Sequence, residues 1–452
     1  MKLPEQLIRP WRQDPLLKTV AKNTGYLFSG TAVSTLLTTG ETLLVTLLLG
    51  VSEYGVLGMI FSFTSNINRL LSFRMGEMVV KYAGQYLATE QREQSAAVIK
   101  IGALAEIGTA LLAYLLLYLL APLAAVNIVG GLQYTVWIRL YGLALLSNML
   151  TETATAVLQI GGHYRSQAGL QMAQSALTFG GVAAAYLLGG DLGWVLMAYL
   201  GGKVVYGIGL TAAAVRWLRP MLGAGWAQAP LGLLPGKREL ARFALSTNVS
   251  ATINLLVRDS ELLWIGYFLS AQQAGYYKFA LTIMSLVLLP INPFIQTTFP
   301  EISKAVARLE WSSLRNLLRR TSAIAAAWTI ACLGGILLLG SPILNWYKAG
   351  EYAPAWPLLI ILIAGYGTAN VFFWNRPLLL ALGLPNVPLR VTAVAGLIKT
   401  GLMFVLVRPF GYLMQGLLLA AYFIVSVGAI VWRGVAEVNR RSVQEAAGEV
   451  SP

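Results

Sequence analysis

Eight basic residues lie inside long apolar stretches of this sequence, where a charged side chain is costly and needs a specific reason. They are Arg69, Arg74, Arg139, Lys203, Arg258, Lys278, Arg376 and Lys399. Ammonium and guanidinium groups bind carboxylates and phosphates, and a guanidinium can hold either with two parallel hydrogen bonds. We therefore select Arg69, Lys203, Arg376 and Lys399 as candidate ligands of an anionic substrate in a water-filled cavity.

Arg69 is the embedded base least easily explained by a charged neighbour on its own helix. It lies near the middle of its apolar stretch, beside Asn66 and Asn68, and no acidic residue stands three or four positions from it. A cavity role is one interpretation, and pairing with Glu41 or Glu106 on another helix is the alternative.

Embedded carboxylates indicate a second kind of chemistry. A carboxylate held in an apolar span titrates or binds a cation readily, so Glu41, Asp259 and Glu261 are candidate sites for coupling to a proton or a sodium ion. Arg258 and Glu261 are three positions apart, and a structural pair between them is the alternative.

A third group of charges follows a helical spacing. Arg74, Glu77 and Lys81 stand three and four positions apart, so they share one helix face and can neutralise one another. This spacing predicts a structural charge ladder rather than a binding site.

The elements that must position these side chains are membrane-spanning helices. The chain is 57% hydrophobic and 12% charged, with a mean hydropathy of +0.66. Of its 33 Lys and Arg residues, 23 fall in polar gaps on one side of an alternating series of apolar stretches, and two fall in the gaps on the other side. Basic loops stay in the cytoplasm, so this alternation predicts twelve spans with both termini cytoplasmic.

The gap after the sixth span is rich in proline and glycine and predicts a linker between two six-helix halves. The segment 301–320 alternates apolar and basic residues and predicts one amphipathic helix on the cytoplasmic surface. Matches between the halves at an offset of about 220, such as Glu41 with Glu261, indicate parallel repeats. The predicted divisions are a cytoplasmic lead-in (1–23), a first six-helix bundle (24–218), a cytoplasmic linker (219–242), a second six-helix bundle (243–433) and a cytoplasmic tail (434–452).

Several segments resemble the oligosaccharide and polysaccharide flippases of the multidrug/oligosaccharidyl-lipid/polysaccharide exporter superfamily. The segments are LGVSEYG at 49–55, RDSELLWIG at 258–266, AGYYKFA at 274–280, FPEIS at 299–303 and EYAPAWPLLIIL at 351–362. The resemblance implies an all-α membrane fold of two six-helix bundles around a central cavity, and transport of a polyprenyl-diphosphate-linked oligosaccharide by alternating access. The charged stretch 69–81 departs from the family pattern. Lipid II flippases commonly carry two further helices, which disfavours that assignment.

The sequence therefore favours a plasma-membrane flippase for cell-surface polysaccharide synthesis that is not an enzyme. The expected partners are the lipid bilayer, the lipid-linked glycan and other polysaccharide assembly proteins, with no nucleic acid. No phosphate-binding G-x-x-x-x-G-K-[ST] motif occurs, so no ATP hydrolysis is expected, and one cysteine and one histidine predict no metal site. A coupling cation is the one expected cofactor. The alternatives are a cation-coupled multidrug exporter of the same superfamily and a membrane-embedded glycan polymerase or ligase.

Overall fold

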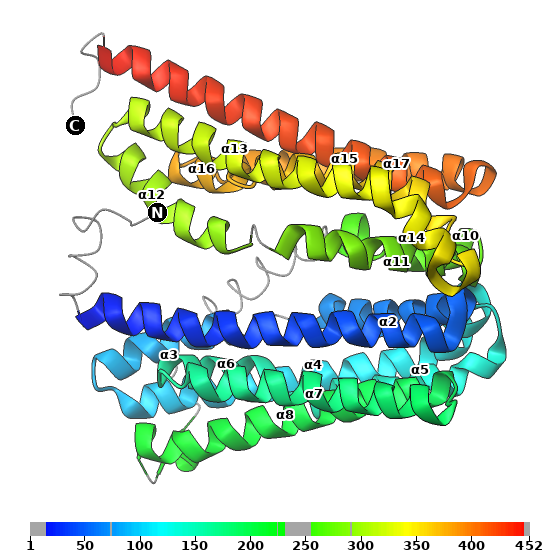
Figure 1. Cartoon of the computed structure of the whole chain (residues 1–452). Coiled ribbons are helices and arrows are strands. Elements are labelled where there is room, and N and C mark those ends of the chain that lie inside the picture. Colours follow the sequence, from blue (N-terminus) through cyan, green and yellow to red (C-terminus); the bar gives the residue numbers. More distant parts are fainter. Residues whose placement is uncertain (1–14, 73–74, 224, 231–254, 290–291, 447–452) are drawn as a thin grey trace. The chain divides into compact units, whose positions relative to one another are not determined.

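The computed structural model describes residues 15–72, 75–223, 225–230, 255–289 and 292–446. These residues are almost entirely helical, and no β-strand occurs among them (Figure 1). Seven helical segments in the described chain are long and apolar enough to cross a membrane. Many of their leucines are exposed, for example Leu397 at 74% and Leu338 at 76%, as lipid-facing side chains must be. The prediction of an all-α polytopic membrane protein is confirmed.

Two of the helices are too long for a single crossing. A straight helix with the 57 residues of α2 (Pro15–Leu71) would be about 85 Å long, whereas the hydrocarbon core is about 30 Å thick. The chain turns at Gly50 in α2 and at Gly411 in α17 (Asn386–Ala446), whose φ angles are 79° and 74°. Glycine adopts this backbone conformation without a Cβ penalty, so each long helix holds two spans.

The chain divides into two compact units. Unit 1 comprises residues 1–49, 63–126 and 131–252. In it α3 packs along α4 and α7 along α8 (Figure 1). Its elements after α2 are α3 (Met75–Ala88), α4 (Arg92–Ala124), η2 (Leu132–Tyr134), α5 (Thr135–Ser147), α6 (Thr151–Ile160), α7 (Tyr164–Leu188), α8 (Leu192–Leu222) and η3 (Trp226–Gln228).

Unit 2 comprises residues 50–62, 127–130 and 253–452. In it α15 packs along α17, and α13 packs along α15. Its elements before α17 include η5 (Leu255–Asp259), α10 (Glu261–Phe268), α11 (Ala271–Leu288), α12 (Asn292–Ala307), α13 (Trp311–Gly335), η7 (Ile336–Gly340), α14 (Ser341–Trp346), η8 (Tyr347–Gly350), α15 (Ala355–Val371) and α16 (Asn375–Ala381). The linker predicted at 219–242 begins inside α8, and its part from 231 lies outside the described residues, so that division stays a prediction.

A sharp helix-to-helix turn is repeated in the two halves of the sequence. Glu90 (φ 60°) and Leu309 (φ 58°) lie about 220 positions apart, and both have a positive φ that residues other than glycine rarely adopt. The amide of the next residue donates at 2.8 and 2.9 Å to the carbonyls of Tyr86 and Ala305, respectively. The same backbone path therefore joins α3 to α4 and α12 to α13.

A second turn is repeated at nearly the same offset, 221 positions. Gly162 (φ 72°) and Gly383 (φ 76°) end α6 and α16 in the left-handed conformation. The amide after each glycine donates at 2.7 and 2.8 Å to the carbonyls of Leu158 and Leu379, and both leucine side chains are fully buried. These matched turns support internal duplication more strongly than the residue identities do.

The single amphipathic surface helix expected at 301–320 is not formed. The chain turns at Leu309, and the two helices that meet there bury their apolar faces in the core of unit 2. Ile302 and Leu314 are fully buried and Leu318 is 6% exposed. An alternating apolar and basic pattern fits either one surface helix or two helices packed on a core, which is why the prediction was wrong.

Candidate functional site

A buried group of hydrogen-bonded polar side chains in unit 2 surrounds Glu261 and is here called the Glu261 centre. It contains Glu261, Lys399, Tyr277, Gln415 and the carbonyl of Val257. Lys399 Nζ donates to Glu261 Oε1 and to Val257 O, while Tyr277 Oη and Gln415 Nε2 each donate to Glu261 Oε2 at 2.7 Å. The side chains of Lys399 and Glu261 are 4% and 3% exposed.

An irregular stretch of backbone positions the groups of this centre. Residues Leu255–Asp259 form a π-helical turn, and α10 begins at Glu261 directly after it. Ser260 Oγ and Ser260 N both donate hydrogen bonds to the carbonyl of Leu255, at 2.8 and 3.0 Å. The irregular turn brings the Val257 carbonyl within hydrogen-bond distance of Lys399, and irregular backbone of this kind is tolerated in a membrane only inside protein or beside water.

The Glu261 centre brings together two residues that the sequence assigned to different roles. Lys399 was expected to bind an anionic substrate and Glu261 to couple to a cation, and the structure pairs one with the other. It also shows that Glu261 pairs with Lys399 in place of Arg258, whose guanidinium lies 5.6 Å from the ring of Phe423. An ion pair whose remaining oxygen accepts two further hydrogen bonds is electrostatically satisfied. The assigned substrate and coupling roles stay predictions.

A second buried carboxylate in unit 1 also has a basic neighbour. Glu41 on α2 is 2% exposed, accepts a hydrogen bond from Tyr199 and interacts electrostatically with Lys203, both on α8. Glu41 Oε1 is buried and has no hydrogen-bond partner within the described part of the chain. Glu41 therefore has one carboxylate oxygen without a hydrogen bond from the described residues, whereas both oxygens of Glu261 accept hydrogen bonds. Such an oxygen can bind a proton or a metal cation.

Two further embedded glutamates in unit 1 cap interrupted helices. Glu106 on α4 accepts hydrogen bonds from the amides of Glu152 and Thr153, at 2.8 and 3.0 Å, at the first turn of α6. Glu152 in turn accepts from Ser72 Oγ at 3.1 Å and from the amide of Gly76 at 3.3 Å, at the first turn of α3. The first amides of a helix lack partners within that helix, and a carboxylate there also stabilises the positive end of the helix dipole.

Beside these caps unit 1 contains a pocket of about 670 Å³. It is lined by residues of α3, α6 and α8. Glu77 and Lys81, two members of the predicted charge ladder, are exposed and line it, together with Glu152, Gln159 and Tyr206. Arg74, the third member of the ladder, lies outside the described residues.

The remaining predicted site residues do not lie in these clusters. Arg69 is exposed in the last turn of the second segment of α2, and Arg376 is exposed in the first turn of α16. Each stands next to a break in a helix, where the backbone itself is polar. Asp259 ends the π-helical turn and is partly buried.

Sequence reasoning missed the environment of Lys278 in unit 2. Its ammonium lies 4.1 Å from the ring centre of Tyr54 and 5.1 Å from that of Phe61. These two aromatic faces stabilise the embedded charge. The spacing of Tyr54 and Phe61, seven positions apart on one helix, is the signal that could have been read.

The fold, built of long apolar helices, defines a polytopic α-helical membrane protein. Residues 20–306 match the family model described as "Polysaccharide biosynthesis protein". The match covers more than half of the chain, so the chain belongs to the polysaccharide biosynthesis protein family.

Two curated relatives are similar to the chain. "Inner membrane protein YghQ" of Escherichia coli (strain K12) is 22% identical over 357 residues, which are 78% of this chain and 99% of the relative. "Teichuronic acid biosynthesis protein TuaB" of Bacillus subtilis (strain 168) is 21% identical over 294 residues, 61% of this chain and 59% of the relative.

Solved structures show the same fold at low sequence identity. A multidrug resistance MATE family transporter of the MOP superfamily, in an inward-facing conformation, is similar with a TM-score of 0.71 and 14% identity over 90% of this chain and 95% of that one. The lipid II flippase MurJ, in an inward closed conformation, is similar with a TM-score of 0.68 and 13% identity over 93% and 91% of the two chains.

Proposed function

We propose that this protein is a flippase that moves a polyprenyl-diphosphate-linked oligosaccharide across the plasma membrane for cell-surface polysaccharide synthesis. The observation that carries the proposal is the match of residues 20–306 to the polysaccharide biosynthesis family in a chain built of membrane-spanning helices. A glycan precursor made on a lipid carrier at one face of a membrane must be moved before it is used at the other face.

The charges of the described chain support an anionic cargo. Arg69 and Arg376 are exposed guanidinium groups beside helix breaks, and a guanidinium can hold a phosphate through two parallel hydrogen bonds. A cationic drug would favour acidic and aromatic linings instead. The embedded acids Glu41 and Glu261 each lie beside a lysine, and neither offers an uncompensated negative charge.

The proposal includes alternating access without ATP hydrolysis, no enzymatic activity, and an ion gradient as the driving force. Glu41, with its open oxygen, is the better supported position for a coupling proton or sodium ion, because Lys399 already compensates Glu261. The proposal also places both termini and the linker 219–242 in the cytoplasm, on the distribution of basic residues. The inner-membrane relative supports a plasma-membrane location.

The deciding experiment is transport by the purified protein in liposomes. A fluorescent polyprenyl-diphosphate-linked oligosaccharide is placed in both leaflets, and the fraction exposed outside is followed with a membrane-impermeant glycosidase, with no nucleotide present. We expect the protected fraction to become accessible only in liposomes that contain the protein. If the glycan stays protected while a cationic dye crosses under a proton or sodium gradient, the multidrug exporter replaces the flippase.

A second measurement tests the role in cells. A deletion strain should accumulate polyprenyl-linked intermediates, and mass spectrometry of the lipid extract would also identify the glycan. Intermediates that stay on the cytoplasmic face, resistant to an external glycosidase in spheroplasts, support a flippase. Unpolymerised units that reach the outer face point to the polymerase or ligase alternative.

A further inference from the structure

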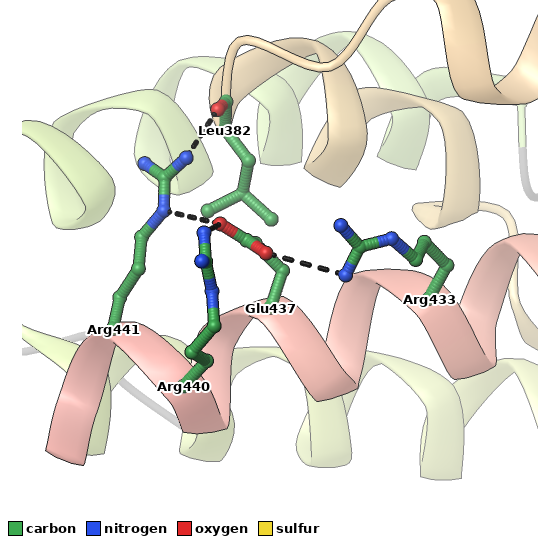
Figure 2. Close-up of polar contacts among 5 residues, drawn as sticks. All are labelled: Leu382, Arg433, Glu437, Arg440 and Arg441. Carbon is green, nitrogen blue, oxygen red and sulfur yellow. Dashed lines mark hydrogen bonds and ion pairs between the residues drawn. The ribbon is translucent and has the colours of Figure 1, made fainter. Parts of the chain in front are cut away.

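The last turns of α17 carry a cluster of three arginines around one buried carboxylate. Figure 2 shows the guanidinium groups of Arg433, Arg440 and Arg441 pointing toward Glu437. Glu437 Oε1 accepts from Arg440 Nη2 at 2.6 Å and from Arg441 Nε at 2.9 Å, and Oε2 accepts from Arg433 Nη1 at 3.2 Å. The Glu437 side chain is 1% exposed. One carboxylate thus fixes the positions of three cations.

Neighbouring helices hold this cluster in place. Arg441 Nη2 also donates at 2.9 Å to the carbonyl of Leu382, directly after α16 (Figure 2). From α13, Arg315 donates to Asn439 Oδ1 at 3.3 Å and to Ser442 Oγ at 3.1 Å. Four arginines and one glutamate therefore gather at the end of unit 2 with a surplus of positive charge.

The arginines keep unused capacity for an anion. The side chains of Arg433 and Arg440 are 40% and 61% exposed, and each donates one hydrogen bond to Glu437. A guanidinium carries five donors in a planar fork, so each can still bind a phosphate oxygen pair. Glu437 orders these side chains in advance and so reduces the conformational entropy lost on binding.

An exposed apolar stripe runs beside the arginines on the same helix. Trp432, Val435 and Val443 are 73%, 41% and 68% exposed. At 3.6 residues per turn they fall within an arc of about 80°, and Arg440 and Arg433 follow about 60° to 80° further around the helix. Tryptophan is enriched where a span meets the headgroups, which places this stripe at the edge of the bilayer.

We propose that this surface, Arg433, Arg440 and Arg315 with the stripe of Trp432, Val435 and Val443, binds an anionic phospholipid of the surrounding leaflet. The phosphate contacts the guanidinium groups and an acyl chain lies along the apolar stripe. The surplus positive charge selects an anionic over a zwitterionic headgroup. A soluble phosphate would make no use of the apolar stripe, which is why we assign a lipid. The inference goes beyond the proposed transport function and does not rest on it.

Native mass spectrometry of the purified full chain tests the proposal, with phosphatidylglycerol and phosphatidylcholine as probes. We expect retention of phosphatidylglycerol over phosphatidylcholine, and Arg440→Ala should weaken the phosphatidylglycerol affinity about fivefold. The matched control is Arg216→Ala, which removes the same charge from an exposed position at the end of α8 and should leave the affinity unchanged.

Glu437→Gln separates an ordered site from simple charge attraction. This change raises the net charge by one, so attraction alone would tighten lipid binding. If Glu437 positions the arginines, the affinity falls severalfold instead. Equal or tighter binding by a folded Glu437→Gln protein together with unchanged binding by Arg440→Ala would overturn the proposal. So would loss of polyprenyl diphosphate binding alone in Arg440→Ala, because that result assigns the surface to the substrate.

Discussion

Lys399 and Glu261 lie 138 positions apart in the chain and form an ion pair whose side chains are 4% and 3% exposed. Removing one member of such a pair leaves a buried charge without a partner, whereas removing both leaves a neutral site. We therefore expect a single substitution in this pair to destabilise the protein more than substitution of both residues.

Lys399→Met should lower the free energy of unfolding by about 3–5 kcal/mol, because Glu261 then stays buried and uncompensated. The double variant Lys399→Met with Glu261→Gln should regain most of the loss. Thermal unfolding of the purified protein in nanodiscs measures both. A single variant as stable as the wild type would show that the two charges are not coupled.

Arg69→Ala should reduce transport about tenfold or more while the protein stays folded and abundant, since an exposed guanidinium that binds a phosphate contributes about 1.5–3 kcal/mol. Arg69→Lys should keep part of the activity, because the charge remains and the planar fork is lost. Liposome transport and membrane abundance are measured together, with Arg216→Ala as the control. Full transport by Arg69→Ala would remove Arg69 from the substrate site and leave Lys203, Arg376 and Lys399 as candidates.

Glu106→Ala should destabilise the protein by about 1–3 kcal/mol for each of the two amides that lose their acceptor. Glu106→Gln retains one carbonyl oxygen and should lose about half as much. Glu93→Ala is the control, since Glu93 is an exposed acid in the first turn of the same helix. Equal stability of the Glu93 and Glu106 variants would refute the capping role.

Gly55 and Gly275 permit a backbone-to-backbone contact inside unit 2. A Cβ on Gly55 would overlap the carbonyl oxygen of Ala271, and a Cβ on Gly275 would overlap that of Val51. Gly275→Ala should therefore cost about 1–3 kcal/mol of stability. Gly108→Ala should be neutral or slightly stabilising, because its added methyl group meets open space and alanine favours the helix. Protein abundance and the midpoint of thermal unfolding distinguish the two.

Glu437 predicts a pH dependence of stability. Hydrogen bonds from Arg440 and Arg441 lower its pKa from 4.5 to about 2. A carboxyl group with a lowered pKa stabilises the fold above its unfolded pKa and loses that contribution as the pH falls through its folded pKa. The stability difference between the wild type and Glu437→Gln should be constant near pH 7 and shrink between about pH 4.5 and 2. A difference that does not change over that interval would contradict the ion-pair account.

The sequence was sufficient for the all-α membrane class, because apolar helices long enough to cross a bilayer are recognised by their length and hydropathy. It was not sufficient for the charge pairs. Helical spacing suggested Arg258 for Glu261, but the actual partner Lys399 comes from a distant helix that only the tertiary fold brings near. The helix breaks that Glu106 and Glu152 cap were also invisible, since a broken span is as apolar as a continuous one.

The two buried carboxylates Glu41 and Glu261 occupy matching positions in the two halves, but their lysines do not match. Lys203 and Lys399 stand on different spans of their respective halves. At the offset of 222 between Gly189 and Gly411, which both have a positive φ, the counterparts of these lysines are apolar, Val425 and Leu177. Each half therefore compensates its buried acid from a different span, α8 for Glu41 and the first segment of α17 for Glu261, so a substitution that mimics one lysine in the other half would not reach the matching acid.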